Sequence, residues 1–162
     1  MARLAVSDSP LLEALDLEGR RTGFSYSIET LKEFHTMFSP DPELFFIIGI
    51  DAFLEIKSWK EYPNLFDYAH FVIIQRPGFQ PEDLKPLLLD LGSEPKETVE
   101  PNVMTVPSGK TLILMAPTLM DISSTRVRGM VAEGKSICFL VPESVREFIM
   151  EKGLYRSHAN DR

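Results

Sequence analysis

Three short apolar runs constrain the fold of this chain more than any other feature of its sequence. Each is bounded by proline, glycine or polar residues, and they span 44–48 (LFFII), 70–74 (HFVII) and 112–116 (LILMA). A continuous apolar run of this length suits a strand that is covered on both faces, as in a parallel sheet. Stretches with helical spacing separate the runs, so the order predicts βαβ units and an α/β fold with a mainly parallel sheet.

The remaining elements are expected around these strands. Helices are predicted over 28–38, 52–59, 64–69, 81–90 and 142–153, the last turn of a helix over 1–6, and further strands over 11–17 and 103–106. Ser25 or Ser27 can cap the helix that starts at Ile28. We expect one domain over 1–156 and a tail over 157–162.

Composition excludes several classes of protein. The 162 residues include 24 acidic and 17 basic side chains, which argues against broad electrostatic binding of nucleic acid. No run approaches the ~18 apolar residues of a membrane span. The first six residues are too short and too soon polar for a signal peptide, so a cytoplasmic location is expected. The single cysteine, Cys138, lies in an apolar run and is predicted to be a core residue.

Familiar catalytic signatures are missing from the sequence. It has no Gly-x-Ser-x-Gly elbow, no Walker loop, no Gly-x-Gly-x-x-Gly turn and no metal-ligand spacing of cysteine and histidine. No protein-held metal is therefore expected.

Three loops at the carboxyl ends of the predicted strands can instead form a ligand crevice. In the first, Gly49 would let the backbone approach a nucleotide and Asp51 could accept a hydrogen bond from a ribose hydroxyl; the alternatives are a strand-end turn and a helix cap. The second contains Arg76. The third loop spans 121–129 (DISSTRVRG) and combines hydroxyl groups, two arginines and a predicted helix start. This combination suits a phosphate, and the alternative is an ordinary helix cap followed by two solvated arginines.

Taken in order, these blocks resemble bacterial nicotinate-nucleotide adenylyltransferases. The similar blocks are 25–27 (SYS), 46–51 (FIIGID), Trp59, 76–78 (RPG), 122–128 (ISSTRVR) and 154–156 (LYR). The Ile-Ser-Ser-Thr-x-hydrophobic-Arg pattern alone is shared with the wider nucleotidyltransferase superfamily, so the order and spacing of all the blocks make the resemblance specific. It covers the chain from Arg3 to Arg156 and implies a three-layer Rossmann-like nucleotidyltransferase fold.

The resemblance also implies the site and the reaction. ATP would bind at Gly49, Asp51, Ile122, Ser123, Ser124, Thr125 and Arg128, with Arg128 as the catalytic residue of this chain. Nicotinate mononucleotide would bind at Tyr26, Ser27, Trp59, Lys60 and Arg76, with Trp59 stacking on the pyridine ring; partial core burial is the alternative for Trp59. The implied reaction transfers AMP from ATP to nicotinate mononucleotide, with Mg²⁺ accompanying ATP, and gives deamido-NAD and pyrophosphate. Neither nucleic acid nor a membrane is an expected partner, and an oligomer stays open.

One departure from the family is large. The family begins with a strand and a Gly-Gly-Thr-Phe-x-Pro-x-His-x-Gly-His loop whose histidines bind the ATP phosphates, and no such loop occurs here. We therefore expect an N-terminally truncated fold, with little or no activity in this chain alone. Two alternatives remain: a sister adenylyltransferase that acts on nicotinamide mononucleotide or phosphopantetheine, and a non-catalytic nucleotide-binding fragment.

Overall fold

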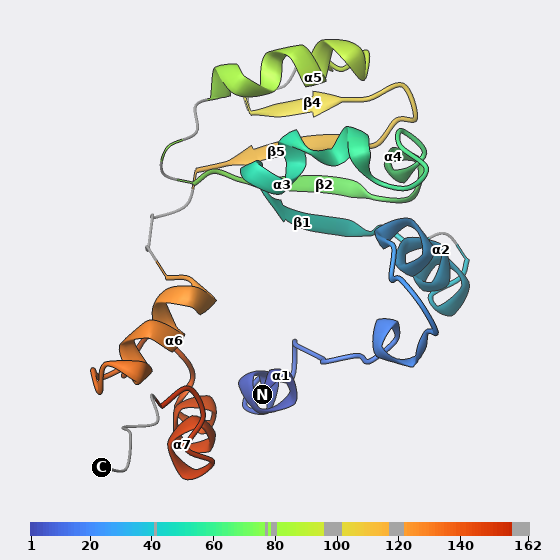
Figure 1. Cartoon of the computed structure of the whole chain (residues 1–162). Helices are drawn as coiled ribbons and strands as arrows, with labels where there is room; N and C mark the ends of the chain where they lie inside the picture. Colours follow the sequence, from blue (N-terminus) through green and yellow to red (C-terminus); the bar gives the residue numbers. More distant parts are fainter. Residues whose placement is uncertain (41, 77, 79–80, 96–101, 117–121, 157–162) are drawn as a thin grey trace. The chain divides into compact units, whose positions relative to one another are not determined.

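The chain divides into two compact units in the computed structural model, which describes residues 1–40, 42–76, 78, 81–95, 102–116 and 122–156. The larger unit is Leu17–Leu119, and the smaller one combines Met1–Asp16 with Met120–Arg162 (Figure 1). The single domain over 1–156 stays a prediction, and the tail over 157–162 lies outside the described residues. No helix in the described ranges has both the length and the apolar character of a membrane span.

A five-stranded sheet in the order β1-β2-β5-β4-β3 is the centre of the larger unit. Its longest strands, β1 (Phe45–Gly49), β2 (His70–Ile74) and β5 (Thr111–Met115), are parallel neighbours. The short strands β4 (Val103–Thr105) and β3 (Glu94–Pro95) run antiparallel. All three apolar runs are thus strands within one residue of their expected positions, and the mainly parallel α/β sheet is confirmed.

Helices cover one face of this sheet. The strand register places Phe46, Phe71 and Leu112 side by side, and their face carries the main core. Phe66 packs on it with its ring centroid 4.6 Å from that of Phe71. The helical segments of this unit are η1 (Glu18–Arg20), α2 (Ser27–Met37), α3 (Ile50–Leu54), η2 (Ile56–Ser58), α4 (Leu65–Tyr68), η3 (Pro81–Leu84) and α5 (Lys85–Asp90).

The smaller unit is helical. It contains α1 (Ala2–Val6), α6 (Ser124–Ala132) and α7 (Glu143–Glu151). Its core consists of Val127, Val131, Ile137, Val145 and Ile149. The Ser144 hydroxyl donates to the Leu4 carbonyl at 2.9 Å, which joins the two ends of the chain. As predicted, α7 follows Pro142 and ends before Gly153, whose φ of 60° is in the left-handed region that favours glycine.

Three local predictions are wrong. Residues 11–17 form a turn and extended coil instead of a strand, and Leu11 is 91% exposed. A strand needs a hydrogen-bonded neighbour, and the described sheet offers this segment none. Cys138 is exposed because it lies in the turn after Ile137. No serine caps α2: the helix starts at Ser27 after an extended Tyr26, without a side-chain cap bond.

Candidate functional site

The carboxyl ends of β1 and β2 bring two of the predicted loops together. Arg76 follows β2 by two residues, and its Nη1 donates to Oδ2 of Asp51 at 3.2 Å. Both side chains are substantially exposed. This ion pair places a guanidinium and a carboxylate at the edge of the sheet where parallel α/β folds bind ligands. Pro77 of the same motif lies outside the described residues.

Gly49 is required by the packing of this pair. A Cβ on Gly49 would lie 2.5 Å from Oδ1 of Asp51 and 3.0 Å from Nε of Arg76. Its φ is −71°, so the need for glycine comes from this close approach rather than from an unusual backbone conformation. The Asp51 Oδ1 atom is buried and has no hydrogen-bond partner in the described part of the chain.

A pocket of about 280 Å³ lies at the start of α2. Four of the predicted residues line it: Tyr26, Ser27, Trp59 and Lys60. The Trp59 indole packs edge-on against Phe46 of β1, with 6.0 Å between ring centroids, and the side chain remains partly exposed. Trp59 is therefore partly buried, as the alternative interpretation predicted, and its ring also borders the pocket.

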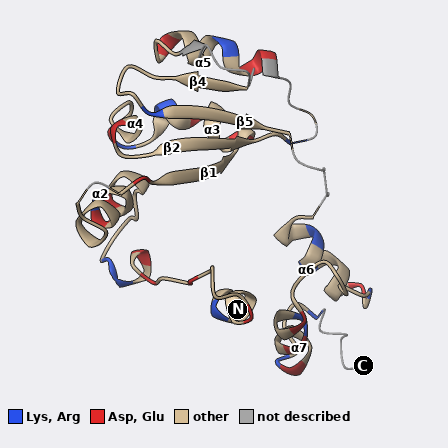
Figure 2. Ribbon diagram, turned by 180° about the vertical axis from the view of Figure 1, so that it is seen from behind, with Lys and Arg blue, Asp and Glu red and all other residues tan. Residues whose placement is uncertain are grey.

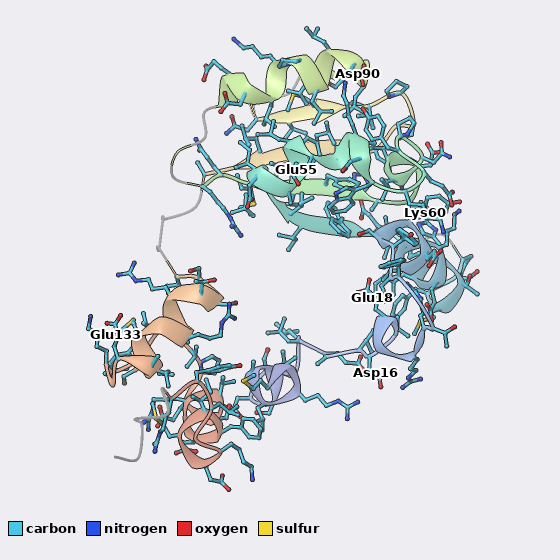
Figure 3. The ribbon with its side chains drawn as sticks, in the orientation of Figure 1. Asp16, Glu18, Glu55, Lys60, Asp90 and Glu133 are labelled. Carbon is cyan, nitrogen blue, oxygen red and sulfur yellow. The ribbon has the colours of Figure 1, made fainter. Side chains whose placement is uncertain are left out.

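Lys60 is held at the rim of this pocket. Its Nζ lies 2.5 Å from Oε1 of Glu29 and 4.4 Å from the centre of the Tyr26 ring. Figure 3 shows Lys60 beside α2. The hydrogen bond between the two side chains lowers the pKa of the Glu29 carboxyl and raises the pKa of the Lys60 ammonium. Both groups are therefore charged at neutral pH, and the pair adds no net charge to the pocket.

The first turn of α2 leaves a free backbone donor beside the same pocket. The helix has no side-chain cap, and the amides of Ser27 and Ile28 have no acceptor within the described ranges. Ile28 is fully buried, so Ser27 is the one of the two that a ligand can reach. Uncapped N–H groups and the positive end of the helix dipole suit an anionic group. Beside an indole and a phenol ring, this arrangement fits a flat ring that carries a carboxylate.

The start of α6, in the smaller unit, is a second anion-binding arrangement. Ser123 is the N-cap residue, and its Oγ accepts from the Arg126 amide at 3.2 Å. The amides of Ser124 and Thr125 have no acceptor among the residues that the structure covers. Arg128 returns to this turn, where its Nη2 donates to Oγ1 of Thr125 at 3.2 Å. Figure 2 marks basic residues in blue on the ribbon of α6.

An adjoining pocket of about 400 Å³ is lined by the same residues and by apolar side chains of the smaller unit. Ser123, Ser124 and Arg128 contribute its polar side, and Ile122 also lines it. The hydroxyls, free amides and guanidinium thus meet at one helix start, and the phosphate site stays a prediction. Ser123 is an ordinary cap, and the cap leaves donors free for a phosphate.

The predicted residues therefore form three groups. Tyr26, Ser27, Trp59 and Lys60 share the α2 pocket; Gly49, Asp51 and Arg76 meet at the strand ends; and Ile122–Arg128 lie at the start of α6. Arg76 was expected at the strand ends near the phosphate of the mononucleotide, and there it pairs with Asp51. The functional role of each residue stays a prediction. Glu29 was missed, although an acidic residue in the first turn of a helix beside a lysine-bearing loop signals an ion pair.

Comparisons with known proteins agree on one family. No protein-family model matches the chain. A protein of Geotalea daltonii named "Probable nicotinate-nucleotide adenylyltransferase" is 40% identical over 156 residues, which cover 96% of this chain and 72% of the relative. A protein of the same name from Desulfitobacterium hafniense is 41% identical over 157 residues, with coverage of 96% and 69%.

A solved structure has a similar fold. It is the nicotinic acid mononucleotide adenylyltransferase of Plasmodium falciparum complexed with APC, which matches with a TM-score of 0.55 at 20% identity. The match covers 83% of this chain and 60% of that chain. At such low identity the likeness concerns the fold, and it supports the Rossmann-like nucleotidyltransferase architecture.

Proposed function

The chain belongs to the nicotinate-nucleotide adenylyltransferase family, and from this premise we propose that it transfers AMP from ATP to nicotinate mononucleotide. The products are deamido-NAD and pyrophosphate. The observation that carries the proposal is the α2 pocket, where Trp59, Tyr26 and Lys60 surround an uncapped helix start. A pyridine ring can stack on Trp59 while its carboxylate accepts from the Ser27 amide.

The phosphates of ATP are assigned to the start of α6. Ser123, Ser124 and Thr125 supply hydroxyl and amide donors, and Arg128 supplies a full positive charge. Arg128 would stabilise the charge that develops on the phosphates as the mononucleotide phosphate oxygen attacks the α-phosphorus and pyrophosphate leaves. Catalysis of this kind depends on alignment of the reactants and on charge stabilisation.

The strand ends supply the remaining contacts. Asp51 would accept from a ribose hydroxyl through the exposed part of its carboxylate, and Gly49 leaves room for the Asp51 and Arg76 side chains. Arg76 would face a phosphate of the mononucleotide, with Asp51 fixing its guanidinium.

Mg²⁺ would enter bound to the ATP phosphates, where it neutralises charge during phosphoryl chemistry. No three His, Cys, Asp or Glu side chains of the described residues lie close enough to hold a metal, so no step is assigned to a protein-held ion. Oligomerisation is left open by the geometry of the described residues.

The test is formation of deamido-NAD by this protein, expressed together with any coding sequence that precedes Met1 in its gene. We expect product from ATP, Mg²⁺ and nicotinate mononucleotide, with loss of product when either nucleotide is omitted. Arg128→Ala should lower kcat/KM by roughly 30- to 1,000-fold, equivalent to about 2–4 kcal/mol, as for the loss of one donor to a charged transition state. Arg126→Ala, at the position between the motif residues, is the matched control. Absence of deamido-NAD would refute the proposal, and an unaltered kcat/KM in Arg128→Ala would refute the role of Arg128.

A further inference from the structure

We propose that Glu29, acting through Lys60, sets how strongly the α2 pocket prefers nicotinate mononucleotide over its amide, nicotinamide mononucleotide. This inference rests on the proposed function and adds a specificity-determining residue to it. Glu29 is the third residue of α2, one turn from Tyr26. Its partner Lys60 lines the pocket, whereas Glu29 lies on the other side of Tyr26, in a separate hollow with Arg20 and Arg21.

Glu29 fixes where the positive charge of Lys60 lies. The Nζ atom is 2.5 Å from the Glu29 carboxylate and 4.4 Å from the centre of the Tyr26 ring, so it is held over the face of a pocket residue. Without Glu29, the flexible four-carbon stem would let the ammonium turn toward the pocket or toward solvent. The neighbouring charges are already engaged elsewhere: Arg21 with Glu33, and Lys32 with Glu61.

The Glu29–Lys60 pair affects the binding of the acid more than the binding of the amide. A carboxylate bound at the start of α2 is attracted by Lys60 and repelled by Glu29, so the two effects partly cancel. The amide has the same ring and ribose phosphate but no charge on the ring substituent, so the pair affects its binding much less. Charges at such distances near a protein surface change affinity by roughly 3- to 10-fold at physiological ionic strength.

Removal of the pair should leave the fold intact. Both side chains are substantially exposed, at 40% for Lys60 and 36% for Glu29. Exposed ion pairs contribute little to stability because water and salt screen them. A change in ligand preference can therefore be separated from unfolding.

The experiment uses Trp59 as the probe, since it is the only tryptophan of the chain and lines the pocket. Nicotinate mononucleotide and nicotinamide mononucleotide are titrated separately, and quenching of Trp59 gives a Kd for each. The measured quantity is the ratio of the amide Kd to the acid Kd. Four variants are compared with wild type: Glu29→Gln, Lys60→Gln, the double variant, and Glu133→Gln.

The expected pattern has opposite signs in the two single variants. Glu29→Gln leaves Lys60 uncompensated and raises the ratio about 3- to 10-fold; Lys60→Gln leaves Glu29 uncompensated and lowers it by a similar factor. The double variant returns to within about twofold of wild type. Glu133→Gln is the matched control because the Lys135–Glu133 pair has the same charge type and a 2.6 Å separation, is exposed, and lines no part of the pocket. Its ratio should stay within about twofold of wild type.

Two results would overturn the inference. If Glu29→Gln leaves the ratio within about twofold of wild type, or weakens both ligands equally, Glu29 does not select between them. In that case the proposed function would stand, because wild type would still bind nicotinate mononucleotide. If wild type binds neither ligand, both the inference and the proposed function fail. Melting temperatures of all variants confirm that each is folded during the titration.

Discussion

At the scale of single residues, the strand-end site depends on one missing side chain. Gly49 leaves space for the Asp51 carboxylate and the Arg76 guanidinium, which lie within 3.0 Å of where its Cβ would be. This approach keeps the Asp51 Oδ1 atom buried yet without a partner. A buried carboxylate oxygen without a donor is costly, and such exceptions concentrate at sites that bind ligands. The glycine therefore serves ligand binding more than it serves folding.

Gly49→Ala should consequently weaken nucleotide binding while the protein stays folded. The new methyl group displaces Asp51 and Arg76, whose exposed side chains can move at a cost of about 1 kcal/mol. We expect the Kd for ATP, measured by calorimetry, to rise by about tenfold or more. Gly129→Ala is the matched control, because a Cβ there meets nothing within 4 Å and alanine favours the interior of α6. That control should gain about 0.5–1 kcal/mol of stability and keep wild-type affinity. Equal affinities in the two variants would contradict the role of Gly49.

At the scale of elements, the sequence predicts strands better than it predicts edges and caps. The runs around Ile48, Ile73 and Leu112 are strands, and these three side chains are buried. The continuous apolar pattern also predicted cover on both faces. This is wrong for β1, which is at one edge of the described sheet and whose Ile47 side chain is 70% exposed. The alternation over 11–17 is equally visible in the sequence but has no neighbouring strand in the described sheet. Strand formation there depends on a distant partner, which local pattern cannot reveal.

The candidate site was predictable to a similar extent. The resemblance to the family pointed to Tyr26, Ser27, Trp59 and Lys60, and these residues share one pocket. Spacing did not predict that Arg76 pairs with Asp51, since that contact depends on the register between β1 and β2. It also missed Glu29, because its partner is 31 positions away along the chain. Pairings between distant elements are set by tertiary packing.

One such pairing makes stability depend on pH. Tyr62 precedes α4 and its hydroxyl donates to Asp90 of α5 at 3.0 Å; Lys57 also binds Asp90, at 2.8 Å. Burial, followed by the bond to Asp90, raises the pKa of Tyr62 to about 12. The pKa of tyrosine in an unfolded chain is about 10, so the folded state holds the phenol proton more tightly and is favoured while the phenol is neutral. The contribution of the neutral Tyr62 phenol to the free energy of unfolding is complete below pH ~10 and is lost as the pH rises toward the folded pKa.

Tyr62→Phe tests this link between α4 and α5. Urea unfolding at pH 9 and again at pH 11.5 gives the loss of unfolding free energy over that interval for each protein. We expect wild type to lose more than Tyr62→Phe, because only wild type has the phenol that ionises there. Ionisation of the other tyrosines and the lysines is common to both proteins and cancels in the comparison. Identical losses would show that Tyr62 ionises with the same pKa in the folded and unfolded states.

At the scale of the whole molecule, the two compact units have very different cores. Among the described residues, the cluster in the larger unit has sixteen buried members and that in the smaller unit has five. Burial of apolar area is the main favourable term in folding, so the smaller unit has much less stability of its own. It nevertheless carries the first turn of α6, to which we assign the ATP phosphates. Ligand-binding segments are often drawn from the less stable parts of a protein.

Amide hydrogen exchange should therefore separate the two units. In the free protein we expect amides of β1, β2 and β5 to exchange slowest, and those of α6 and α7 at least about tenfold faster. A ligand that binds the folded state stabilises it by mass action, so ATP should slow exchange in α6. Gly129→Ala, which stabilises α6 without touching a neighbour, should slow exchange there in the absence of ATP. Protection of α6 and α7 equal to that of β2 in the free protein would mean that residues 1–156 open as one cooperative domain, and the stability difference inferred from the two cores would be wrong.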